Sequence, residues 1–317
     1  MVKAVLTGLS IWIALTVSGC ALQQPVTEHA LPKEDEVIKQ QLKVKYKVAI
    51  LLSSDAEAYS SVAEILLASK KHDFSLFVLD GIKNNSIVND LNSGDYDCFV
   101  TLGLPATISM TESASNKVIF SQIFNYYEYD LNKPGVMGVS VFPSAKDLMS
   151  TWQKLSPDLN SVVVITGEGL DSYINSAQKM AKSHGIELVH MLASNDKEFL
   201  YFIKNKTSLA QGYWLLPDNR ILSGRVLKEF LSFSSKRSRQ VAVFSAELLN
   251  YGGLISIAPS RKGIANSILE NIDGLVKNEL VAGFMANVAD SDIYINSIVA
   301  DQLGLVIDKS IRQFVYE

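Results

Sequence analysis

The most constraining feature of this chain is a series of short apolar runs that alternate with segments of helical spacing. The first run, residues 48–52, contains no polar residue, which is typical of a strand buried on both faces of a sheet. Further strands are expected at residues 74–79, 98–102, 117–121, 136–141, 161–166, 187–191, 212–216, 240–244, 254–258 and 293–296. Helices are expected at residues 56–69, 82–91, 105–111, 144–155, 173–184, 196–203, 223–233, 261–278 and 297–303. This alternation predicts an α/β fold with parallel sheets covered by helices on both faces.

The series of strands is interrupted once, at the polar and aromatic residues 125–134. A chain of 317 residues is long enough for two domains of ordinary size. We therefore expect two doubly wound lobes, each with a sheet of its own, joined by a hinge.

The N-terminus has the pattern of a secretory signal: a basic start at Lys3, an apolar run over residues 4–17, and the small residues that end at Cys20. The run is shorter than the roughly 20 residues that a bilayer span needs. Residues 17–20 also resemble the bacterial lipoprotein box, which implies lipidation of Cys20; the alternative is an ordinary signal with a chance cysteine.

The polar residues 21–45 are expected to be a tether that holds the body off the membrane. The protein is then expected on the periplasmic side of the cell envelope. An aspartate directly after the lipidated cysteine would resemble an inner-membrane retention signal, but residue 21 is Ala. The absence of that aspartate favours the outer over the inner membrane.

Composition and motifs argue against several function classes. The formal net charge of −4 gives no indication of the basic face that nucleic-acid binding requires. If Cys20 is acylated, Cys98 has no disulfide partner, and its apolar surroundings indicate a small buried side chain. No zinc-ligand spacing, nucleophile elbow, P-loop or dinucleotide fingerprint occurs, so we expect no metal, no cofactor and no enzymatic activity.

Candidate binding residues follow the strands, because ligands of open parallel sheets collect at the carboxyl ends of the strands. Four aromatic residues lie within residues 124–129, and they form either a stacking wall for a ligand or a seal between the lobes. Asp218 either accepts a hydrogen bond from a ligand amine or starts the following helix. Small residues at 53–55 and 101–105 either bind an anion or only cap helices.

Several of these segments, taken in order, resemble the tryptophan-binding and related solute-binding proteins of bacterial ABC importers. The resemblance covers about residues 46–306 and is carried by residues 101–106, 138–140, 214–219, 222–223, 241–245, 252–254, 293–296 and 303–304. It implies the type I periplasmic-binding fold, a small-molecule ligand between the lobes and an ABC permease as partner. It also implies one lobe of residues 46–141 plus 252–285 and another of residues 142–251 plus 286–317.

The resemblance and the loops together give a set of expected ligand contacts. We expect stacking by aromatic rings, hydrogen bonding by hydroxyl and amide groups, and charge pairing by carboxylates, and the set is Thr101, Gly103, Phe124, Asn125, Tyr127, Glu168, Asp218, Ser245 and Glu247. Residues 125–130 and 167–169 depart from the pattern of the family. An alternative is therefore a regulatory or interaction lipoprotein that keeps this fold and contacts another envelope protein.

Overall fold

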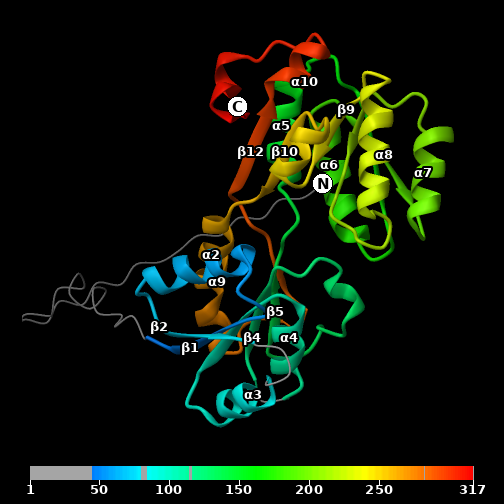
Figure 1. Ribbon diagram of the computed structural model, residues 1–317. Helices are drawn as coiled ribbons and strands as arrows, with labels where there is room; N and C mark the ends of the chain where they lie inside the picture. Colours follow the sequence, from blue (N-terminus) through cyan, green and yellow to red (C-terminus); the bar gives the residue numbers. More distant parts are fainter. Residues whose placement is uncertain (1–44, 80–83, 114–115, 282, 317) are drawn as a thin grey trace, which may run out of the picture. The chain divides into compact units, whose positions relative to one another are not determined.

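The computed structural model describes residues 45–316 except 80–83, 114–115 and 282. The expected signal, the lipidation site Cys20 and nearly all of the tether lie outside the described residues. None of the helices within the described ranges has the length and apolar character that a bilayer span requires. Figure 1 labels the helices α2 to α10 and several of the strands.

The first lobe contains a six-stranded sheet in the order β11-β5-β4-β3-β1-β2, and all of its pairings are parallel. Its strands are β1 (Lys47–Leu52), β2 (Asp73–Val78), β3 (Cys98–Leu102), β4 (Val118–Ser121), β5 (Val136–Val139) and β11 (Met285–Ala286). Its helices are α2 (Glu57–Ala68), α3 (Asn84–Ser93), α4 (Leu104–Thr111) and α9 (Arg261–Val276). One apolar layer contains residues of α2 and α9, and the other contains residues of α3 and α4, so both faces of the sheet are covered.

The second lobe contains a seven-stranded sheet in the order β13-β12-β10-β9-β8-β6-β7. Its strands are β6 (Ser161–Thr166), β7 (Glu187–Leu192), β8 (Gly212–Trp214), β9 (Gln240–Val243), β10 (Ile255–Pro259), β12 (Ser291–Asn296) and β13 (Val315–Tyr316). Only the β10–β12 pairing is antiparallel within the described ranges.

Helices cover both faces of this second sheet as well. They are α5 (Ala145–Leu155), α6 (Asp171–Ser183), α7 (Asp196–Asn205), α8 (Gly224–Ser235) and α10 (Ser297–Gln302), with 3-10 turns at η3 (Ala246–Tyr251) and η4 (Lys309–Phe314). A further 3-10 turn, η2 (Tyr126–Glu128), lies between β4 and β5 of the first lobe. Residues of α5 and α6 belong to one apolar layer, and residues of α7 and α8 belong to the other.

Local sequence signals explain where the helices begin. Ser144, Asn195, Ser223 and Ser260 each accept a backbone N–H of the first helical turn with a side-chain oxygen. Burial explains the strands, since residues 48–52 are at most 1% exposed. Cys98 is also fully buried, and burial raises the pKa of its thiol to about 12, as expected for an inert side chain.

The chain passes between the two sheets three times: between β5 and α5, between β10 and α9, and between β11 and β12. The sequence placed residues 252–285 in the first lobe, but β10 pairs with β9 and β12 of the second sheet. By sheet membership, the second passage therefore comes after Pro259 rather than near residue 252. The reason is that residues 255–257 are fully apolar or buried and extend the second sheet before the chain leaves it.

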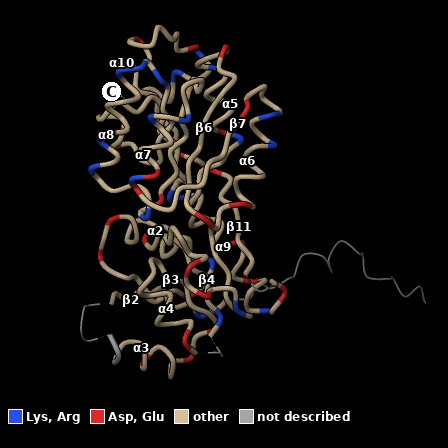
Figure 2. Tube along the Cα trace, turned by 90° about the vertical axis from the view of Figure 1, so that its right-hand side faces the viewer, with Lys and Arg blue, Asp and Glu red and all other residues tan. Residues whose placement is uncertain are grey.

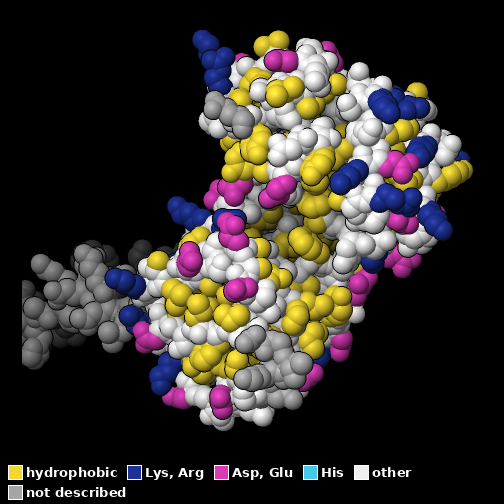
Figure 3. All heavy atoms as spheres, viewed as in Figure 1, with side chains coloured by type: hydrophobic (Ala, Val, Ile, Leu, Met, Phe, Trp, Pro, Cys, Tyr) yellow, Lys and Arg dark blue, Asp and Glu magenta, His cyan; other side chains and the backbone are white. Residues whose placement is uncertain are grey.

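Charged residues of both signs are interspersed along the trace (Figure 2). On the face shown in Figure 3, hydrophobic side chains are likewise scattered among charged ones.

Candidate functional site

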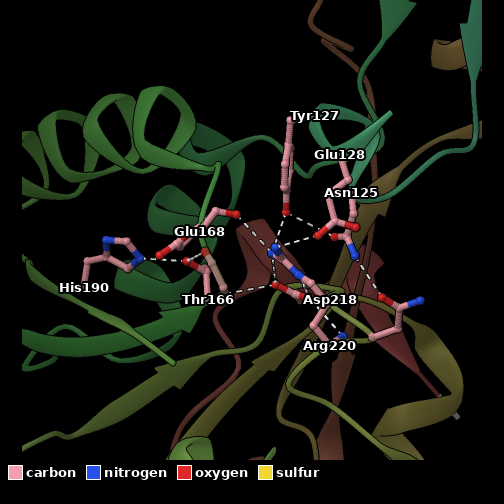
Figure 4. Close-up of polar contacts among 10 residues, drawn as sticks. Asn125, Tyr127, Glu128, Thr166, Glu168, His190, Asp218 and Arg220 are labelled. Carbon is pink, nitrogen blue, oxygen red and sulfur yellow. Dashed lines mark hydrogen bonds and ion pairs between the residues drawn. The ribbon is translucent and has the colours of Figure 1, made fainter. Parts of the chain in front are cut away.

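The strand-end loops of the two sheets meet around one arginine that the sequence did not point to, Arg220 (Figure 4). This residue follows β8 of the second sheet and contacts residues that follow β4 of the first sheet. We use the name Arg220 cluster for Asn125, Tyr127, Glu128, Asp218, Asn219 and Arg220. Because its members come from both lobes, the cluster connects them.

Asp218 is 3% exposed, and both of its carboxylate oxygens are used. Oδ2 accepts the backbone N–H of Gly167 at 2.9 Å and Nη2 of Arg220 at 2.7 Å. Oδ1 accepts the backbone N–H of Arg220 at 3.1 Å and its Nε at 2.9 Å. Burial alone would raise the pKa of this carboxyl, but the hydrogen bonds from Arg220 and Gly167 outweigh it, and the pKa lies below its usual value.

The guanidinium of Arg220 has further partners in both lobes. Nη1 donates to Oε1 of Glu128 at 2.9 Å, and Nη2 donates to the hydroxyl of Tyr127 at 2.7 Å. Nη2 also donates to the backbone carbonyl of Glu168 at 3.1 Å. The carbon of the guanidinium lies 5.3 Å from the centre of the Tyr127 ring, a cation–π distance. One arginine thus neutralises a buried and a half-exposed carboxylate at once.

Amide and hydroxyl groups complete the cluster. Asn125 is 6% exposed, and its Nδ2 donates to Oδ1 of Asn219 at 2.8 Å. The Tyr127 hydroxyl donates to Oδ1 of Asn125 at 3.2 Å. Burial is the main reason that the pKa of Tyr127 is raised, so its hydroxyl stays protonated and available as a donor.

Two glycines after β6 make room for these contacts. A Cβ on Gly167 would lie against the Arg220 guanidinium, and a Cβ on Gly169 would lie against the Tyr127 ring. Gly169 also has a φ of +96°, which L side chains rarely adopt. Thr166 steadies the start of this loop, because its hydroxyl lies 2.8 Å from the Gly167 carbonyl and 2.8 Å from Nε2 of His190. The glycine-rich departure from the family pattern thus accommodates Tyr127 and Arg220.

Directly beside the cluster is a small apolar cavity, which we name the hinge cavity. Its volume is about 180 Å³. Its walls include the strand-end residues Gln122, Phe124, Pro217 and Phe244, together with Val141 and Ile257 next to the passages between the sheets. Gln122 contributes the one hydrogen-bonding side chain among the described lining residues and has a left-handed φ of +61°.

Two larger cavities lie near the same junction. One of about 510 Å³ is bounded by the N-terminal parts of α5 and α6 and by residues 287–289. Another of about 400 Å³ is bounded by Tyr126, Tyr127 and residues 283–285. Within the described ranges, no group of three or more histidine, cysteine, aspartate or glutamate side chains is placed to hold a metal ion.

The structure brings some of the expected binding residues together. Asn125, Tyr127 and Asp218 meet in the Arg220 cluster, joined by the Glu168 carbonyl. Phe124 is 45% exposed and lines the hinge cavity. Tyr126 packs against core residues of both lobes, which supports the interpretation of the aromatic segment as a seal, whereas the stacking wall for a ligand stays a prediction. Whether any of these residues contacts a ligand stays a prediction.

Other expected residues have local partners and line none of these cavities. Thr101 is buried with its hydroxyl 2.8 Å from that of Thr107. Gly103 precedes α4 with a φ of +90°, and its N–H donates to the Ser121 carbonyl at 3.0 Å. Ser245 donates its hydroxyl to the carboxylate of Glu247. Their ligand contacts also stay predictions.

Asp218 does not start the helix that follows it. Ser223 caps α8, whereas Asp218 closes a turn in which its carbonyl accepts the N–H groups of Ile221 and Leu222. Arg220 was missed although it lies two residues after Asp218. An arginine so close to an acidic residue in a strand-end loop is the signal that could have found it.

Comparisons with known proteins place the fold. A scan against protein-family models found no match, and a search of curated proteins found none either. Among solved structures, an ABC domain from Streptococcus pneumoniae in complex with L-Trp has a TM-score of 0.57 at 16% identity, covering 86% of this chain and 100% of its own.

Two further structures match over similar lengths. A conserved domain protein from Vibrio cholerae has a TM-score of 0.56 at 16% identity and covers 86% of this chain and 99% of its own. The ligand-free, open structure of a substrate binding protein with adhesive properties from Clostridium difficile has a TM-score of 0.62 at 12% identity, with coverage of 86% and 99%. At these identities the similarity concerns the fold, and it confirms that the chain has two α/β lobes of the type I periplasmic-binding-protein kind.

Proposed function

We propose that this chain is an extracytoplasmic solute-binding lipoprotein that holds a small amino-acid-like or aromatic solute between its lobes and presents it to an ABC permease. The observation that carries the proposal is the hinge cavity. Its walls combine strand-end loops of both sheets with residues next to the passages between them. A ligand there touches both lobes, so its binding free energy can stabilise one relative orientation of the lobes.

The fold comparisons support this proposal without naming the solute. One structure of the same fold is a complex with L-Trp, and another is a substrate binding protein in an open, ligand-free state. A fold of this kind therefore accommodates both small-molecule binding and an open form.

The experiment is a thermal-shift screen of amino acids, aromatic acids, indoles and sugars, followed by calorimetry on the compounds that raise the Tm. We expect Ala258→Leu, which fills the hinge cavity, to abolish the shift. The matched control is Ala289→Leu, which adds the same three carbon atoms to the wall of the cavity of about 510 Å³ and should leave the shift intact. If the thermal shift persists in Ala258→Leu but disappears in Ala289→Leu, the solute binds in the cavity of about 510 Å³ rather than in the hinge cavity.

The anchor is tested separately at Cys20. We propose that this cysteine carries the lipid and that the protein sits on the periplasmic side, on the outer rather than the inner membrane. Labelling with radioactive palmitate should mark the wild-type protein and leave Cys20→Ala unlabelled. Membrane fractionation of labelled cells then distinguishes the two membranes.

A second candidate is the regulatory or interaction lipoprotein, and the Arg220 cluster favours it. Side chains of the protein itself already make the lobe-to-lobe contacts that a ligand makes in a binding protein. Two results together would support this candidate over solute binding. The screen would give no thermal shift with any compound, and small-angle scattering would show that Arg220→Gln changes the relative orientation of the lobes.

A further inference from the structure

An ammonium group that leaves water needs an anion or several acceptor oxygens, since an unpaired buried charge is very costly. Asp218 is the buried carboxylate of this junction, and the hydrogen bonds of Arg220 and Gly167 already use both of its oxygens. The nearby Glu128 carboxylate also accepts from Arg220. Arg220 thus already pairs with the buried carboxylate that follows the cavity-lining residue Pro217, so an ammonium group finds no unpaired carboxylate there.

The hinge cavity adjoins the Arg220 cluster, because its wall contains residues that directly precede cluster residues in the sequence. Phe124 and Pro217 line the cavity, and the residues that follow them, Asn125 and Asp218, belong to the cluster. The described lining residues carry no charge. An apolar cavity of about 150 Å³ is enough to bind benzene. A cavity of about 180 Å³ with such walls therefore suits one uncharged ring system.

A single polar side chain, Gln122, is present among the described lining residues. Gln122 is held in a left-handed backbone conformation with a φ of +61°, which for a residue other than glycine stores strain. Its carboxamide can both donate and accept a hydrogen bond. One amide in an otherwise apolar wall offers specificity for a ring that carries a single N–H or oxygen.

We propose that the hinge cavity binds an uncharged aromatic ring system with one hydrogen-bonding group, and that Arg220 excludes free α-amino acids by occupying Asp218. The inference rests on the proposed function and narrows its ligand class. It assigns Arg220 as a specificity-determining residue that acts through Asp218. An indole, rather than tryptophan itself, is the kind of molecule that fits.

The test compares indole, tryptamine and L-tryptophan by calorimetry on the full-length protein. These probes share one ring and differ in their charged groups. For the wild type we expect measurable indole binding, and binding of tryptamine and tryptophan weaker by roughly ten-fold or more, because the ammonium group finds no free carboxylate. For Arg220→Gln we expect tryptamine to bind roughly ten-fold more tightly than to the wild type, since Asp218 is released. Arg225→Gln is the matched control, because that arginine is exposed on α8 and pairs with Asp196 at 3.9 Å, away from the Arg220 cluster.

Each outcome decides between the two proposals. Tryptophan binding as tightly as indole to the wild type would overturn the inference and leave the proposed function standing. No binding of any probe or library compound would overturn both. If Arg220→Gln fails to fold, the ranking of the three probes on the wild type still decides. A folded Arg220→Gln without any gain for tryptamine would remove Arg220 as the excluding residue.

Discussion

The Arg220 cluster and the hinge cavity lie side by side at the junction of the lobes, yet their side chains satisfy opposite requirements. In the cluster, the polar groups of both lobes pair with one another. In the cavity, apolar side chains of both lobes face unfilled space. Buried polar groups have to find partners within the protein, whereas apolar walls around a cavity gain contacts when an apolar ligand enters it. The comparison teaches that capacity for a ligand lies in the apolar region, while the polar region fixes how the lobes meet.

The largest loss of stability is expected when the carboxylate at the centre of the Arg220 cluster is removed. Asp218→Ala leaves Arg220 half-buried without its main partner and takes the acceptor away from the Gly167 N–H. We expect a loss of about 3 kcal/mol in the free energy of unfolding, at the low end for a broken buried pair because the Arg220 side chain is 25% exposed. Urea denaturation measures this loss.

A double-mutant cycle with Arg220→Ala is the control for this prediction. If the pair is coupled, the double variant should be less destabilised than the sum of the two single variants. Additive losses would show that Asp218 stabilises the protein through the Gly167 loop alone.

Acid should weaken the same interaction in part. The pKa of Asp218 is lowered in the folded protein, so the folded state binds fewer protons than the unfolded chain between the two pKa values. The stabilisation is complete above the usual value of 3.8 and is lost as the pH falls through the folded pKa. We expect the difference in unfolding free energy between wild type and Asp218→Asn to be constant near neutral pH and to shrink below about pH 4. A difference that stays constant in acid would contradict the lowered pKa.

The fold could be predicted from the sequence because its signals are local. Runs such as residues 48–52 and 162–165 are apolar throughout, and cap residues such as Ser144 mark where helices begin. The short strands β11 and β13 were missed, since two residues carry no periodicity. The sheet membership of β10 was wrong because an apolar strand suits either sheet equally well.

The candidate site could be predicted only as far as its loops. The rule that ligands gather at strand ends drew attention to Asn125, Tyr127 and Asp218, which the structure brings together in one cluster. What those side chains contact depends on residues about 90 positions away, as the 94-residue separation of Asn125 and Asn219 shows. No local pattern encodes such a pairing. Asp218 therefore looked like a ligand contact, although the structure pairs it with Arg220.

A smaller loss of stability is expected where the glycine loop after β6 packs against Tyr127 of the Arg220 cluster. Gly169→Ala should cost about 2–3 kcal/mol, since the new methyl group meets the Tyr127 ring in an unfavourable backbone conformation. Gly185→Ala is the matched control, because Gly185 has a φ of +72° with open space around it, and only the backbone cost of about 1 kcal/mol applies. Thermal denaturation of both variants measures the difference, and Tyr127→Leu should relieve the Gly169→Ala defect. Equal losses at the two glycines would mean that the ring contact carries no weight.

The smallest effect on stability is expected on the cavity side, at Phe124. This ring is 45% exposed, so Phe124→Ser should change the free energy of unfolding by no more than about 0.5 kcal/mol. Its buried part lines the hinge cavity, and loss of that wall should weaken the binding of an aromatic ligand by about ten-fold. Tyr251→Ser is the control, because Tyr251 is similarly exposed but does not line the cavity. Calorimetric titration of both variants, beside their unfolding free energies, separates the two roles. A large loss of stability with unchanged ligand affinity in Phe124→Ser would place this ring with the Arg220 cluster rather than with the hinge cavity. The boundary between the two regions would then lie at a different residue.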